Sequence, residues 1–103
     1  MPIWRPESVN EDPEIALINW TVFETTDEGE HHFVGTVANQ GYARVSSPIQ
    51  SYDSESRVGI TRSGRKYRLV GNPGIDSDGS YILWQWLDLN AKPNIDSVYE
   101  QYL

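Results

Sequence analysis

The chain has 103 residues, with fifteen acidic and eight basic side chains and a formal net charge of −7 at neutral pH. This length suits one domain with a single core, and the negative charge argues against sequence-independent nucleic-acid binding by the whole surface. The lack of cysteine excludes disulfides and thiolate metal sites. Because no signal-peptide core and no apolar run of roughly 20 residues is present, we expect a soluble, cytoplasmic protein that does not enter a membrane.

The charge is unevenly distributed along the chain. Residues 1–30 hold eight acids and one basic residue, residues 31–75 two acids and six basic residues, and residues 76–103 five acids and one basic residue. A basic middle of this kind is able to bind an anion, whereas the acidic ends are able to bind a basic partner.

Three prolines predict a flexible acidic tail over residues 1–13. Residues 14–103 are expected to form one domain. Alternating apolar side chains predict a strand over 14–26, with Ile18, Trp20 and Val22 on one face and Leu17 and Phe23 on the other. After a turn at 26–29, a second strand is expected over 31–37, which makes an antiparallel hairpin.

A third strand is predicted over 43–52, either at an edge of the sheet or bulged at Pro48, because proline lacks an amide donor. The segment 57–71 predicts a tight hairpin with Ser63 and Gly64 as its two loop residues. The expected cross-strand pairs are Val58–Leu69, Ile60–Tyr67 and Arg62–Arg65, with the four apolar residues on one inner face.

The C-terminal part is expected to be helical. A helix is favoured over 81–89 because possible capping residues precede it, although a buried strand is the open alternative for so apolar a run. Residues 94–103 carry apolar side chains at helical spacing and predict a second helix. The predicted fold is therefore α+β: an antiparallel, curled sheet of about five strands with one or two C-terminal helices packed on it. The predicted core comprises Ile18, Trp20, Val22, Phe33, Val45, Ile60, Tyr67, Leu69, Trp84, Leu87 and Val98.

Signals for catalysis or metal binding are weak. His31 and His32 lie near Glu28 and Glu30, but adjacent residues of a strand point to opposite faces, and zinc needs three or four converging ligands. The sequence contains no Gly-x-Ser-x-Gly elbow, Walker loop or dinucleotide fingerprint. We expect no metal, no cofactor and no identifiable catalytic residue, while paired carboxylates leave an unrecognised active site open.

One set of motifs resembles short uncharacterised bacterial proteins of similar length. The motifs are Arg44–Ile49 (RVSSPI), Tyr52-Asp53, Thr61–Leu69 (TRSGRKYRL), Gly71–Gly74 (GNPG) and Trp84. The resemblance covers about residues 15–90 of the printed sequence. It implies a bacterial or phage origin and a stand-alone domain, and it implies no activity and no functional residue.

Three functional hypotheses follow. The leading one is a small non-catalytic binding module that acts on a protein partner, for example an inhibitor or immunity-type protein. The second is binding of an anion or nucleic acid through the basic hairpin 57–68. The third is an enzyme with an unrecognised site. The candidate binding residues of the hairpin are Arg57, Arg62, Arg65, Lys66 and Arg68.

Overall fold

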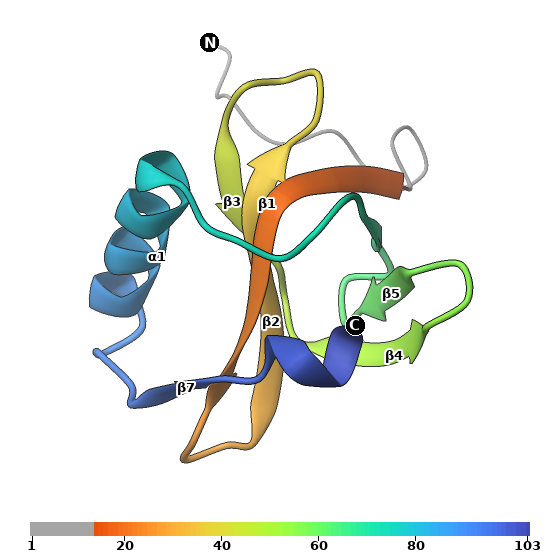
Figure 1. Cartoon of the computed structure of the whole chain (residues 1–103). Coiled ribbons are helices and arrows are strands. Elements are labelled where there is room, and N and C mark those ends of the chain that lie inside the picture. The colour runs from red at the N-terminus through yellow and green to blue at the C-terminus, as the bar shows by residue number, and fades with distance from the viewer. Residues whose placement is uncertain (1–13) are drawn as a thin grey trace, which may run out of the picture.

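The longest strand, β1 (Glu14–Thr25), lies at the centre of the sheet and pairs on both edges (Figure 1). One edge pairs with antiparallel β2 (Glu30–Val37). The other edge pairs near its start with parallel β6 (Lys66–Leu69) and near its end with antiparallel β7 (Ile95–Ser97). The computed structural model describes residues 14–103, and the predicted tail lies outside the described residues.

Three shorter strands complete the sheet: β3 (Ala43–Val45), β4 (Ile49–Asp53) and β5 (Val58–Thr61). The strand order is β3-β2-β1-β6-β5-β4, with β7 beside β1. The predicted α+β class and mostly antiparallel sheet are confirmed, but the sheet has seven strands rather than about five. One reason is that the predicted third strand is two strands, because Pro48 interrupts the pairing.

The sheet is curled but not closed. Strands β3 and β4 lie at opposite ends of the strand order, yet only residues 46–48 join them. Figure 1 shows β4 and β5 turned across the direction of β1 and β2. Inside the curl, the Phe33 ring of β2 packs against Tyr52 of β4 and Tyr67 of β6, with centroid distances of 6.4 and 5.7 Å.

The core inside the curl has nine buried residues, and eight of them lie on strands β1, β2 and β6. Its members are Ile15, Leu17, Trp20, Val22, Phe33, Val37, Tyr67, Leu69 and Tyr102. The prediction that Ile18 belongs to this core is wrong, because its side chain is exposed. A bulge between Ile18 and Thr21 shifts the alternation, and Asn19 takes a φ of 47° that asparagine tolerates well.

The predicted register of the basic hairpin is wrong by one residue. The Thr61 amide donates to the Arg65 carbonyl at 3.0 Å, so the loop has three residues and ends at Gly64, whose φ is 87°. This is the loop type in which a left-handed glycine follows a turn. Residue 60 therefore opposes Lys66, and Ile60 is exposed rather than in the core.

The helix α1 (Ser77–Leu89) confirms the helical interpretation of 81–89, and it packs against β2 and β3 on the face opposite the curl (Figure 1). Its N-cap is Asp76, whose carboxylate accepts from the Gly79 amide at 2.8 Å. The same carboxylate accepts from Asn19 at the bulge and from Thr36 of β2, both at 3.2 Å. These bonds fix the start of α1 on the sheet, and the bond from Gly79 is the main cause that lowers the pKa of Asp76.

The predicted second helix over 94–103 is wrong. Residues Ile95–Ser97 form β7, and Tyr99–Tyr102 form the short 3₁₀ helix η1. The short strand β6 pairs with only the first part of β1 and leaves the rest of that edge open. Strand β7 pairs with the end of this edge and satisfies its backbone groups. The apolar residues of this segment pack on the core instead. Tyr102 of η1 is buried against Phe33, with a distance of 5.8 Å between the ring centroids.

The close approach of β5 to Phe33 gives the first prediction. A Cβ on Gly59 would lie 2.5 Å from Cζ of the buried Phe33 ring. Gly59→Ala is therefore expected to lower the free energy of unfolding by about 1–3 kcal/mol, as overpacking of a core does. Denaturant unfolding measures the change. The matched control is Gly74→Ala, where a Cβ meets nothing within 4 Å; equal stability of both variants would contradict the prediction.

Candidate functional site

Two of the five predicted binding residues lie at opposite ends of β5. Arg57 precedes the strand, donates to the Gly71 carbonyl at 2.9 Å and lies over the Trp20 ring at 5.8 Å. Arg62 follows the strand in the hairpin loop and forms an ion pair with Glu30 of β2. Each arginine therefore has contacts within the chain, and that of Arg62 is with an opposite charge.

Of the other three predicted residues, Arg65 directly precedes β6, and Lys66 and Arg68 lie within it. Arg65 is buried, whereas Lys66 and Arg68 are exposed on the opposite face. Arg68 pairs with Glu14 at 3.4 Å between Nε and Oε2. The structure thus brings Lys66 and Arg68 together and separates them from Arg65, so the five basic residues do not share one surface.

The outer face of α1 is the most exposed aromatic surface of the described chain. We define this outer face as Tyr81, Trp84, Gln85, Asp88 and Leu89. The exposed fractions are 63% for Tyr81, 68% for Trp84 and 85% for Leu89. The prediction that Trp84 belongs to the core is therefore wrong. Helical geometry turns it away from the sheet, because Ile82, Leu83, Trp86 and Leu87 already form the inner face.

The inner face of α1 contributes Trp86 to an aromatic stack on the sheet. His32 and Phe23 are opposite each other on β2 and β1, and their rings stack at 5.2 Å with an interplanar angle of 15°. Trp86 lies 4.8 Å from the His32 centroid and 5.2 Å from the Phe23 centroid. The His32 side chain is consequently buried, at 4% exposure.

The protonation state of His32 follows from its contact with Ser46. The Nδ1 atom lies 2.8 Å from the Ser46 carbonyl oxygen. A carbonyl only accepts, so Nδ1 carries the proton and Nε2 has a free lone pair in the neutral ring. Burial lowers the pKa of His32 from its ordinary 6.5. This effect outweighs the Ser46 hydrogen bond and the nearby carboxylates of Glu30 and Glu28, all of which raise the pKa.

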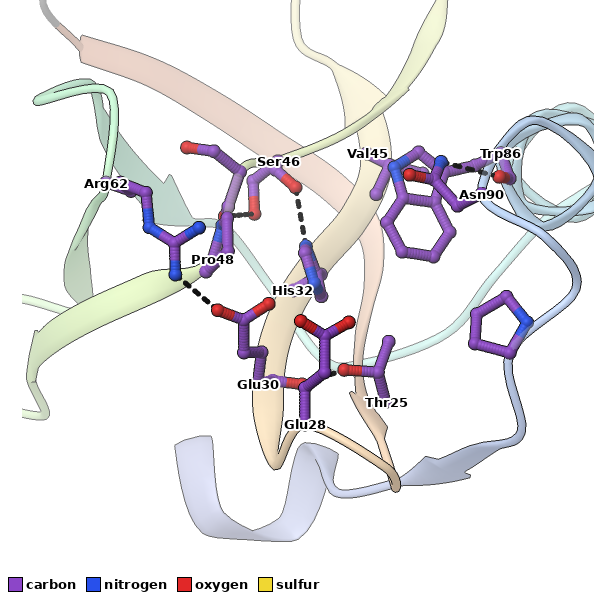
Figure 2. A pocket seen from close by; sticks show the side chains of 12 residues that line it. Thr25, Glu28, Glu30, His32, Val45, Ser46, Pro48, Arg62, Trp86 and Asn90 are labelled. Atoms are coloured by element: carbon purple, nitrogen blue, oxygen red, sulfur yellow. Dashed lines mark hydrogen bonds and ion pairs between the residues drawn. The ribbon is translucent and has the colours of Figure 1, made fainter.

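A cavity of about 390 Å³ opens beside His32 (Figure 2). Its walls come from the turn between β1 and β2, the link 46–48, the hairpin loop and the end of α1. Figure 2 shows the Glu28 and Glu30 carboxylates directed toward His32, with Arg62 beside Glu30. Segments distant in the sequence thus place a neutral imidazole, two carboxylates and a guanidinium around one space.

The neighbouring His31 faces the opposite side of β2, as strand alternation predicts. Its Nδ1 lies 2.6 Å from the Tyr102 hydroxyl, and its Nε2 lies 3.3 Å from a Glu24 carboxylate oxygen. Within residues 14–103, no group of three or more histidine, aspartate or glutamate side chains is placed to hold a metal ion. The two histidines therefore have separate surroundings.

Sequence reasoning missed both the cavity and the outer face of α1. The His31-His32 dipeptide predicts one histidine on each face of the strand, but it does not indicate which polar groups either ring meets. The pairing of His32 with Ser46 depends on the curl of the sheet, which no local pattern encodes. For α1, the pair Trp84 and Trp86 was the available signal, because residues two apart on a helix cannot both face the sheet.

The burial of His32 gives a prediction for the pH dependence of stability. Because its pKa is lowered in the fold, the unfolded chain binds the proton first as the pH falls. The stabilisation by neutral His32 is complete above 6.5, the ordinary pKa, and declines below it, by at most about 1.4 kcal/mol per pH unit for one proton.

Denaturant unfolding of the wild type and of His32→Phe between pH 7.5 and 5 tests this. The wild type should lose more stability than His32→Phe, which cannot take up the proton. His31→Gln is the matched control, since it removes the adjacent histidine and leaves His32 in place. Parallel curves for the wild type and His32→Phe would contradict the prediction.

Comparison with known proteins adds no relative. No protein-family model, curated protein or solved structure matches the chain. The described residues contain no helix that is both long and apolar enough to span a bilayer. The resemblance to short bacterial proteins stays a prediction.

Proposed function

We propose that this protein is a small non-catalytic binding module that docks on a protein partner through the outer face of α1. The observation that carries the proposal is the exposure of Trp84, at 68%, next to Tyr81, at 63%. Tryptophan and tyrosine are the residues most often found at the energetic centre of protein interfaces. Such a module acts by covering a surface of its partner, as an inhibitor or immunity-type protein does.

The outer face is not needed to hold α1 on the sheet. The helix packs on β2 and β3 through its inner face, and Asp76 fixes its start. Tyr81 accepts a hydrogen bond from Gln85 Nε2 at 2.9 Å, so an exposed contact already restrains its ring. Side chains that are exposed and restrained lose little conformational freedom when a partner covers them.

The charge of α1 indicates the chemistry of the partner. Residues 77–89 contain Asp78 and Asp88 and no lysine or arginine. The nearest basic side chain along the chain, Lys92, pairs with Asp88 at 3.8 Å. An amphipathic helix of this kind suits an apolar groove with basic residues along its rim. We therefore propose a partner with such a groove, and expect its association rate to fall with increasing salt.

The second hypothesis, anion or nucleic-acid binding through the hairpin, has weaker support. Arg57, Arg62 and Arg68 each have an internal acceptor or ion pair within residues 14–103. Arg65 is buried, which limits its access to an external phosphate. An exposed surface formed by Lys66 and Arg68 remains, and two cations contribute little to phosphate affinity at physiological salt.

Replacing both aromatic side chains tests the proposal. Tyr81→Ser combined with Trp84→Ser should weaken binding to the reconstituted partner by about 30-fold or more, the loss typical of a 2 kcal/mol interface residue. Stability should change little, because these side chains contact mainly solvent. The partner is captured from host lysate, purified, and titrated with each variant by calorimetry.

The matched control is Ile60→Ser, an exposed apolar residue on β5, which should bind like the wild type. Equal affinity of the double variant and the wild type would contradict the proposal. Sedimentation of the isolated protein provides a second check: a dimer that the double variant abolishes would assign the outer face to self-association instead.

A further inference from the structure

The cavity beside His32 offers an external ligand mainly hydrogen-bond acceptors. The neutral polar side chains in its wall direct a donor into the protein. Thr25 donates to the Glu30 carbonyl at 3.3 Å, and Asn90 Nδ2 donates to the Trp86 carbonyl at 2.8 Å. The Ser46 hydroxyl donates to the Ser47 carbonyl at 2.8 Å, and the Ser47 hydroxyl donates to Ser63 Oγ at 3.3 Å.

His32 presents an acceptor at the same place. Its Nδ1 proton is bound to Ser46, and Nε2 has no hydrogen-bond partner among residues 14–103. Every buried side-chain nitrogen and oxygen atom in that part of the chain has a partner. The Nε2 atom must therefore reach solvent, although only 4% of the His32 surface is exposed. Because His32 lines the cavity, we take the cavity as the place where Nε2 does so.

The charge of the cavity wall is also that of a cation site. Glu28, Glu30 and Arg62 line it, so the fixed charges leave one negative charge in excess while His32 is neutral. Arg62 pairs with Glu30, and its guanidinium thus already occupies one carboxylate. Glu28 has no ion pair among the described residues, and its carboxylate is directed toward His32 (Figure 2).

We propose that this cavity binds a small planar cation with N–H donors, a guanidinium or amidinium group, through His32 Nε2 and the Glu28 carboxylate. The planar fork of such a group places several donors in one plane, which suits an imidazole lone pair and a carboxylate together. Trp86 contributes aromatic surface to the wall, and aromatic rings attract cations. This site is separate from the outer face of α1.

The proposal also specifies how binding depends on pH. The groups whose charges act on His32 are Glu28 in the β1–β2 turn, Glu30 on β2 and Arg62 in the hairpin loop; the α1 residues in the wall, Trp86 and Asn90, are uncharged. Protonation converts Nε2 from an acceptor into a donor and adds a positive charge. Binding should therefore weaken as the pH falls through the pKa of His32, which burial holds below 6.5.

Titration of the full chain with benzamidine, monitored by amide and histidine-ring NMR signals, tests the site. Benzamidine should shift the His32 ring signals, and neutral benzamide should not. Glu28→Gln should weaken benzamidine binding by about two- to fivefold, which is the affinity that one exposed ion pair contributes. This variant changes an exposed turn residue, so it should fold normally. Glu55→Gln, an exposed acid in the β4–β5 turn, is the matched control.

The source of the cation is resolved by two further probes, agmatine and the peptide acetyl-Gly-Arg-Gly-amide. Tighter binding of agmatine would support a free small molecule, and tighter binding of the peptide would support an arginine side chain of a partner. The proposal is overturned if benzamidine at about 10 mM, which saturates a site of millimolar Kd, leaves the His32 signals unchanged. Equal affinity of Glu28→Gln and the wild type would overturn it as well.

Discussion

The short link between β3 and β4 is the constraint on which the rest of the fold depends. Three residues, 46–48, connect the two ends of the strand order, so the sheet has to curl. Ser46 makes this possible, because its amide donates to the Phe33 carbonyl at 2.8 Å and its hydroxyl accepts from the Phe33 amide at 2.9 Å. The Ser46 side chain thus supplies the acceptor for β2 where the backbone pairing with β3 ends at Val45. Pro48, which has no amide donor, then accepts from the Arg62 amide at 2.8 Å.

The same link connects the core to the cavity. On the inner side of the sheet, the curl brings β5 so close to Phe33 that a Cβ at position 59 would lie 2.5 Å from Cζ of the ring. On the other side, the Ser46 carbonyl holds Nδ1 of His32 and fixes which ring nitrogen faces the cavity. A change at Ser46 would therefore act on packing and on the candidate site together, since both depend on the position of one backbone segment.

Much of the fold could be predicted from local patterns, and the errors have physical causes. Apolar alternation identified β1 and β2, and the polar residues that precede the apolar run 81–89 identified α1. Alternation failed at Asn19, where one extra residue shifts it, and at the basic hairpin, where a three-residue loop moves Ile60 to the outside. The segment 94–103 has helical spacing, but the unpaired edge of β1 outweighed that preference. The cavity was beyond prediction because its residues meet only through the curl.

The rigidity of α1 connects the two surfaces that we propose for binding. At its start, Asp76 joins the helix to the β1 bulge and to Thr36. Toward its end, Trp86 is held in the stack with His32 and Phe23. A helix fixed at two points presents its outer face in one orientation, so a partner does not have to order it on binding. The inner contacts that fix the helix also form the cavity wall, because Trp86 belongs to both. The anchoring of α1 is thus the physical reason why one short helix is able to support two separate sites.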